Sequence, residues 1–161
     1  MADRIELAPE TRRFARTLLD TYSHATLALM IDLGSRTGLW KTLAEAPGTS
    51  GEIARRSRLT ERYVREWLSA VAAAGIVAYE PRRRTFSLDP DRAVCLTGDS
   101  PYNLAAGSRM ALVGAPQASR LVRAFRRGGG IRYSAYLPDF PQIMDELNRR
   151  RYDALLVQAY L

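Results

Sequence analysis

The chain has 161 residues, of which 47% are apolar and 25% charged, and this ordinary balance excludes a disordered protein. Its net charge of +7 comes from 24 basic residues, all arginine except Lys41, against 17 acidic ones. This excess marks either a polyanionic partner such as nucleic acid or arginine used in place of lysine throughout. We favour the second explanation because acids are interspersed in most of the expected helices.

Cysteine content and hydropathy point to a cytoplasmic protein. The single cysteine, Cys95, excludes an internal disulfide and fits a reducing compartment. No apolar stretch is long enough to cross a membrane, and the acidic start MADRIELAPE is unlike a signal peptide. We expect no membrane partner.

In chain order, the apolar spacing predicts mostly helices. Pro9 suits the first turn of a helix that continues to about Gly34, with a possible break near Ser23. A second helix around Trp40 ends before Pro47. After the central segment described next, we expect a short helix capped by Asp89, helices over 102–113 and 116–127, a glycine- and proline-rich loop over 126–141, and a helix over 143–161.

Residues 49–88 predict a complete winged helix-turn-helix. Thr49 or Ser50 caps a short helix, a tight turn follows at Leu59, and a longer helix then runs to Gly75, which suits the positive φ of a helix end. The longer helix carries one apolar stripe, expected to be buried: Tyr63, Val64, Trp67, Leu68 and Val71. Two short strands around a turn at 81–84 form the wing.

The sequence therefore predicts a mainly α fold: a winged helix-turn-helix with a small β-hairpin wing and flanking helical arms. We expect an N-terminal helical arm with the first helices (1–47), the winged core (48–97) and a C-terminal helical segment (98–161). A winged domain needs only about half this length, so the apolar ridges of the arms must be covered. They cover one another, or they interlock across the two-fold axis of a homodimer, which we expect.

Several segments resemble catalytic motifs without their context. MIDLGSRTG over residues 30–38 resembles the first cofactor-binding motif of S-adenosylmethionine (SAM)-dependent methyltransferases. However, Arg36 replaces the central glycine, and the preceding ATLALM favours helix over strand. The glycines at 128–130 follow a basic helix rather than a strand, so we interpret them as a hinge. His24 and Cys95, the latter expected in the core, form no metal site or triad, and we expect no catalytic, cofactor-binding or metal-binding residue in this chain.

The winged segment could also bind DNA through its basic residues. The candidates are two arginines of the longer helix and three at the wing tip: Arg62, Arg65, Arg82, Arg83 and Arg84. Glu61 and Glu66 share the exposed helix face and would be repelled by phosphates. They are spaced to pair with Arg65 and Arg62 within the helix, and this salt-bridged, solvated face explains the pattern without DNA.

The run EIARRSRLTERYVREWLSAVAAAGIVAYE, the return FSLDPDRAVCLT, the helix TGLWKTLAEA and the later GGGIRYSAYLPDF and YDALL together resemble a known family. They are similar to the N-terminal domain of actinobacterial-type class I SAM-dependent methyltransferases. The resemblance covers about residues 20–161 and is most specific in RYVREWL and GGGIRYSAY.

The resemblance implies a domain that dimerises and forms one wall or lid of a substrate pocket, with Tyr133, Tyr136 and Phe140 lining that wall. These aromatic residues could equally fill the dimer core. In such enzymes the SAM-binding catalytic domain begins after the helix matching YDALLVQAYL, where this chain stops. We therefore expect a non-catalytic fragment or truncated chain, with the catalytic domain in cis or in trans. A dimeric winged helix-turn-helix transcriptional regulator is the alternative.

Overall fold

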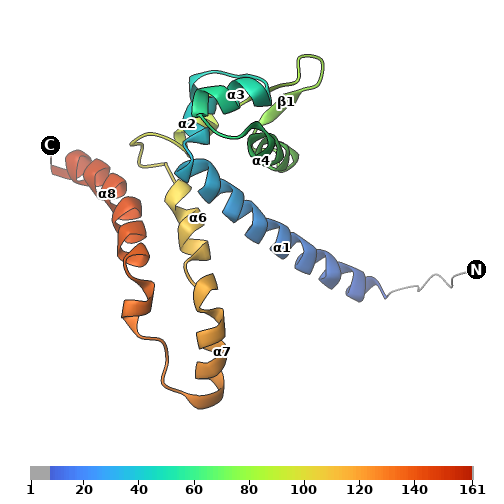
Figure 1. Cartoon of the computed structure of the whole chain (residues 1–161). Coiled ribbons are helices and arrows are strands. Elements are labelled where there is room, and N and C mark those ends of the chain that lie inside the picture. Colours follow the sequence, from blue (N-terminus) through green and yellow to red (C-terminus); the bar gives the residue numbers. More distant parts are fainter. Residues whose placement is uncertain (1–7, 161) are drawn as a thin grey trace, which may run out of the picture.

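A computed structural model describes residues 8–160 of the chain, with side chains up to residue 156. Figure 1 shows a small winged core from which two helical arms project in different directions. The elements in chain order are the helices and strands α1 (Pro9–Arg36), α2 (Leu39–Glu45), α3 (Ser50–Ser57), α4 (Glu61–Ala73), β1 (Ala78–Glu80), β2 (Thr85–Ser87), α5 (Pro90–Val94), α6 (Ala105–Leu112), the 3-10 turn η1 (Ala115–Gln117), α7 (Ala118–Arg127), the 3-10 turn η2 (Tyr133–Tyr136) and α8 (Asp139–Tyr160).

The winged core is a three-helix cluster closed by the β-hairpin. Strands β1 and β2 pair antiparallel with Tyr79 opposite Phe86, and the Phe86 backbone also exchanges two hydrogen bonds with Gly48. The hydrophobic core under this hairpin collects side chains from α2, α3, α4, α5, β2 and the residues next to the two strands: Leu39, Trp40, Leu43, Ile53, Ala54, Val64, Trp67, Leu68, Val71, Val77, Phe86, Leu88 and Ala93. The mainly α fold with a winged helix-turn-helix is confirmed.

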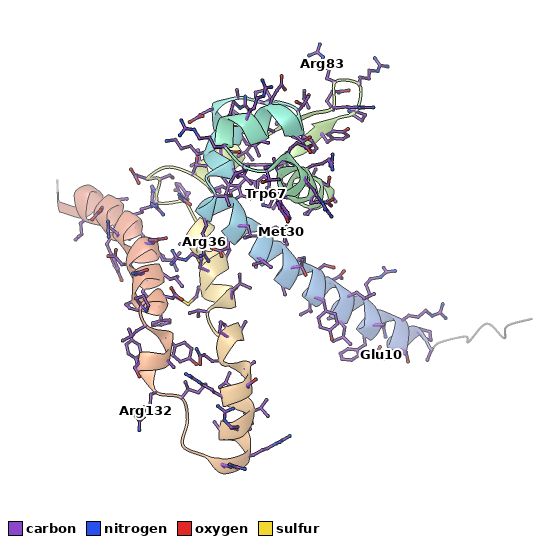
Figure 2. All side chains as sticks on the ribbon, in the orientation of Figure 1. Glu10, Met30, Arg36, Trp67, Arg83 and Arg132 are labelled. Carbon is purple, nitrogen blue, oxygen red and sulfur yellow. The ribbon has the colours of Figure 1, made fainter. Side chains whose placement is uncertain are left out.

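A pair of tryptophans attaches α1 to this core. Trp40 and Trp67 pack edge to face, with ring centroids 4.6 Å apart. The Trp67 indole, which lies beside Met30 in Figure 2, donates to the Met30 backbone carbonyl at 2.8 Å. The Trp40 indole donates to the carbonyl of Ile31 at 3.0 Å. Both rings lie against Gly34, where a Cβ atom would stand only 2.5 Å from each of them. The end of α1 is therefore fitted to the core by the one residue without a side chain.

The helical arms lie largely outside the core. The last third of α1 contacts α2, α4 and α6, whereas the side chains of residues 9–26 are all exposed. In the second arm, α6 and α7 run away from the core and α8 returns beside α6 (Figure 1). Ile143 of α8 is buried there, and Arg109 of α6 pairs with Glu146 of α8 at 2.9 Å. Within residues 8–160, the helices lack the combination of length and apolar character that crossing a bilayer requires.

Several sequence expectations are confirmed and others are wrong. The helix at the N-terminus runs unbroken through Ser23, and the hinge loop is shorter than expected because α8 already begins at Asp139. Tyr63, expected in the buried stripe of α4, is 72% exposed, because it lies beside the stripe rather than within it. Cys95 is exposed rather than in the core. The expected helix end at Leu161 lies outside the described residues.

Helix α3 begins with a reciprocal capping box. The Glu52 carboxylate accepts hydrogen bonds from the Thr49 backbone N–H at 2.7 Å and from the Thr49 hydroxyl at 2.9 Å, and the Glu52 N–H donates back to Thr49 Oγ1. The backbone bond first, and then the side-chain bond, holds the pKa of Glu52 below its ordinary value.

This cap predicts a pH-dependent difference in stability between the wild type and Glu52→Gln. A lowered folded-state pKa stabilises the fold above the ordinary glutamate pKa of about 4.3, and this contribution is lost as the pH falls through the folded-state value. We therefore expect the melting temperature of the wild type to exceed that of Glu52→Gln at neutral pH, with the gap closing as the pH falls below the lowered pKa of Glu52. Glu66→Gln, at an exposed position of α4, is the control and should show no such closing gap. A gap that does not change with pH would contradict the prediction.

Candidate functional site

The aromatic residues predicted to line a substrate pocket lie at the far end of the second arm. Tyr133 and Tyr136 belong to η2, and Phe140 lies in the first turn of α8, after the cis peptide bond between Leu137 and Pro138. The rings of Tyr133 and Phe140 pack edge to face with centroids 6.0 Å apart. Tyr133 is 58% exposed, whereas Tyr136 and Phe140 are partly buried. The structure thus brings two of the three together and leaves the Tyr133 ring available for contact.

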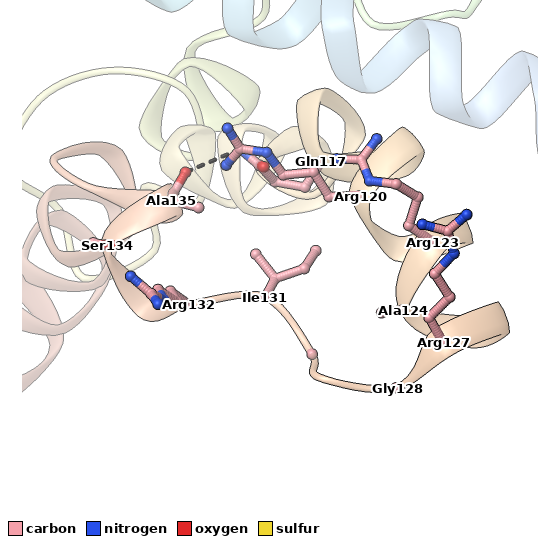
Figure 3. A pocket seen from close by; sticks show the side chains of 11 residues that line it. Gln117, Arg120, Arg123, Ala124, Arg127, Gly128, Ile131, Arg132, Ser134 and Ala135 are labelled. Carbon is pink, nitrogen blue, oxygen red and sulfur yellow. Dashed lines mark hydrogen bonds between the residues drawn. The ribbon is translucent and has the colours of Figure 1, made fainter.

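Beside these aromatic residues is a pocket of about 790 Å³ between α7 and the loop at 128–132 (Figure 3). Arg120, Arg123 and Arg127 extend from α7 on one side, and Arg132 lies on the other side, with Ile131 between them. We call this feature the arginine pocket. Among the residues that the structure describes, none of its four arginines forms an ion pair.

A partly buried glutamine connects the two walls of the arginine pocket. Gln117, at the end of η1, donates from its side-chain nitrogen Nε2 to the backbone carbonyl of Ala135 at 2.9 Å. Its Oε1 atom is buried without a hydrogen-bond partner. Because Ala135 belongs to η2, this bond ties the loop back to the start of α7 and shapes the pocket.

The winged segment carries the residues predicted for DNA binding. Arg65 pairs with Glu61 at 3.3 Å as expected, and Glu61 also accepts a hydrogen bond from the Ser50 hydroxyl at 2.7 Å. The second expected pair does not form: Arg62 makes no ion pair with Glu66 or any other carboxylate in the described part of the chain. Only one of the two expected ion pairs on the exposed face of α4 is therefore present.

The wing tip presents its arginines to solvent. Arg82, Arg83 and Arg84 lie in the exposed turn between β1 and β2, and Figure 2 shows Arg83 at its outer end. Arg84 has a positive φ of 52°. It also lines a pocket of about 610 Å³ together with Arg65, so the structure brings one helix arginine and one wing arginine to the same groove.

Residues 30–38 are helical up to Arg36, so the stretch resembling a cofactor-binding turn does not follow a strand. Its acidic residue, Asp32, is buried, lies 3.6 Å from Arg36 and leaves Oδ1 without a hydrogen-bond partner. His24 and Cys95, far apart in sequence, line one apolar groove of about 330 Å³ between α1 and α6. No local spacing in the sequence connects these two residues, so only the fold shows that they are neighbours.

The winged core has a counterpart among known protein families. Residues 25–98 match the family described as the Rv2258c-like winged HTH domain. Comparison with curated proteins returns no match. The expected resemblance to the N-terminal winged domain of methyltransferases is confirmed at the level of the fold.

Three solved structures share this fold over nearly the whole chain. The mitomycin 7-O-methyltransferase MmcR superposes with a TM-score of 0.64 and 20% identity, over 94% of this chain and 47% of its own. PigF, solved with SAH, gives a TM-score of 0.65 and 17% identity, over 90% and 48%. The dimethyltransferase RosA from Streptomyces davawensis gives 0.60 and 17%, over 89% and 46%. This chain therefore spans about half the length of the proteins it matches.

Proposed function

Because residues 25–98 match the Rv2258c-like winged helix-turn-helix domain, we propose that this chain is the non-catalytic dimerisation and substrate-capping part of a SAM-dependent small-molecule methyltransferase. The observation that carries the proposal is the fold shared with parts of MmcR and RosA, whose names state methyl transfer. The SAM-binding catalytic domain acts in cis or in trans, and SAM is the cofactor of that domain.

The exposed face of α1 supports the homodimer. Large apolar side chains recur along one face at spacings of four and seven residues, which places them in a single stripe: Phe14, Leu18, Tyr22, Leu29 and Leu33. Phe14 and Tyr22 are each 61% exposed. A helix with an uncovered apolar stripe is stabilised by burying it against a partner, and a second copy of α1 supplies a stripe of the same chemistry. We call these residues the α1 stripe.

The aromatic end of the second arm supports the capping role. Tyr133, Tyr136 and Phe140 follow the same glycine-rich loop and form a surface that is partly exposed and partly packed. We assign them to the wall of the acceptor pocket that this arm completes against the catalytic domain. Aromatic faces of this kind suit planar, apolar acceptors.

Calorimetry with SAM tests the non-catalytic part of the proposal. Within the described residues, the strands are β1 and β2 of the wing, so a strand followed by a glycine turn for the cofactor is missing there. We expect no heat of binding when SAM is titrated into this chain. Micromolar binding of SAM would contradict the assignment.

A dimeric transcriptional regulator is the second candidate function. Three wing arginines exposed at one tip, together with Arg65 beside Arg84, favour it. This function requires sequence-selective, salt-sensitive binding to DNA. The variant Arg65→Ala would then relax selectivity at one base position by roughly 1–3 kcal/mol, and wing variants would weaken binding to all sequences. A gel shift that shows no preference for the neighbouring genomic DNA over random duplex would exclude it.

A further inference from the structure

The positive charge of this chain is concentrated in one segment. Residues 100–138 contain six arginines and no aspartate or glutamate, so this segment alone carries +6 of the net charge of +7. The remaining residues therefore contribute 18 basic against 17 acidic side chains. If arginine merely replaced lysine throughout, acids would be interspersed in this segment as they are elsewhere. The concentration instead indicates an anionic partner for this arm.

Five of these six arginines lie on or beside α7, and all of them except Arg126 line the arginine pocket. Arg120, Arg123 and Arg127 recur at three and four residues and line the arginine pocket, whereas Leu121 and Phe125 lie outside its lining and are exposed. Arg132 approaches from the loop (Figure 3). The sixth, Arg109, is neutralised by Glu146. The four pocket arginines have no such carboxylate partner among the described residues, so their charge remains available to an anion.

The arginine pocket has a size and a frame that suit a small molecule. Its volume of about 790 Å³ lies within the range of roughly 300–1,000 Å³ typical of small-molecule sites. The bond from Gln117 to Ala135 fixes one end, and three glycines with positive φ, Gly128 to Gly130, shape the loop at the other. Nothing lies within 4 Å of the Cβ positions of these glycines, so a ligand can approach their backbone closely.

We propose that the arginine pocket binds a small molecule carrying two or more neighbouring negative charges, as phosphate esters and polycarboxylates do. Guanidinium groups bind such oxyanions through paired, charge-assisted hydrogen bonds. The arginines stand on two sides of one hollow, with Arg132 across from those of α7, so a compact anion can contact both sides at once. Ile131, between the walls, supplies an apolar contact for the body of the ligand. This inference goes beyond the proposed function, because it needs no catalytic domain.

Calorimetry with two compact anions tests this site on the 161-residue chain. Pyrophosphate and citrate are titrated separately at low salt, so that the two arms distinguish phosphate from carboxylate recognition. We expect binding of at least one anion that weakens as salt is raised. The double variant Arg123→Ala/Arg127→Ala should weaken it by at least about tenfold, since it removes two charge-assisted partners.

The control is the double variant Arg82→Ala/Arg83→Ala, which removes the same charge at the wing tip and should bind like the wild type. Equal weakening by both double variants means that net charge alone attracts the anion, and it overturns the site. Absence of binding to either anion at low salt also overturns it. A duplex that displaces pyrophosphate and needs both arginine pairs would make nucleic acid the occupant and overturn the small-molecule assignment. Failure of the SAM or dimer tests leaves this result unaffected.

Discussion

Replacing Tyr22 by glutamate is expected to convert the proposed homodimer to monomers, with the dissociation constant raised by about 100-fold or more. Tyr22 lies in the middle of the α1 stripe and is 61% exposed in the single chain. Aromatic residues at the centre of an interface often contribute about 2–4 kcal/mol, and a charge placed there must also be desolvated. Analytical ultracentrifugation over a range of concentrations measures the change.

Ser23→Glu provides a matched control one residue along the same helix. Residue 23 is also exposed, but it lies about 100° around the helix from Tyr22 and outside the stripe. The same charge at this position should leave the dissociation constant close to that of the wild type. If Tyr22→Glu remains as dimeric as Ser23→Glu, the α1 stripe is not the dimer interface.

Replacing Gly34 by alanine is expected to destabilise the chain by about 2 kcal/mol, although alanine is ordinarily better than glycine in a helix by about 1 kcal/mol. The new methyl group would stand 2.5 Å from atoms of both Trp40 and Trp67. Neither indole can retreat without lengthening its hydrogen bond to the carbonyl of Ile31 or Met30. Thermal unfolding should show a melting temperature lower by roughly 4–8 °C.

Gly51→Ala is the matched control, because it adds the same methyl group to a helix at a position where no clash occurs. Gly51 lies in α3, and nothing lies within 4 Å of its Cβ position. The substitution should be neutral or stabilising by up to about 1 kcal/mol. A Gly34→Ala variant as stable as Gly51→Ala would mean that the tryptophans do not press on α1 as the structure describes.

The winged core could be predicted from the sequence because its signals are local. The apolar spacing of α4, the helix stop at Gly75 and the turn between two short strands each lie within a few residues of one another, and each has a physical cause that needs no tertiary context. Tyr63 shows the limit of that reasoning. An aromatic residue next to the stripe fits the pattern as well as one within it, and only packing decides that it is exposed.

The candidate site could be predicted only in part. The aromatic residues could be predicted because the segment that contains them resembles a known family. The arginine pocket could not, because it forms only where the loop returns Arg132 to the side facing α7. Apolar periodicity does not report where a loop returns. The 39 residues from 100 to 138 that contain no acidic side chain were the available signal, and charge counted by segment rather than by chain would have found it.

The two indole N–H groups do more than hold α1 in place. They donate to the carbonyls of consecutive residues, Met30 and Ile31, whose positions lie about 100° apart around the helix axis. A helix bound at two such positions can neither rotate about its axis nor shift by one residue without breaking both hydrogen bonds. The two bonds near the C-terminal end of α1 thereby fix the direction in which Phe14, near its N-terminal end, faces. In the proposed homodimer, the two tryptophans therefore set the direction in which the α1 stripe of each copy faces.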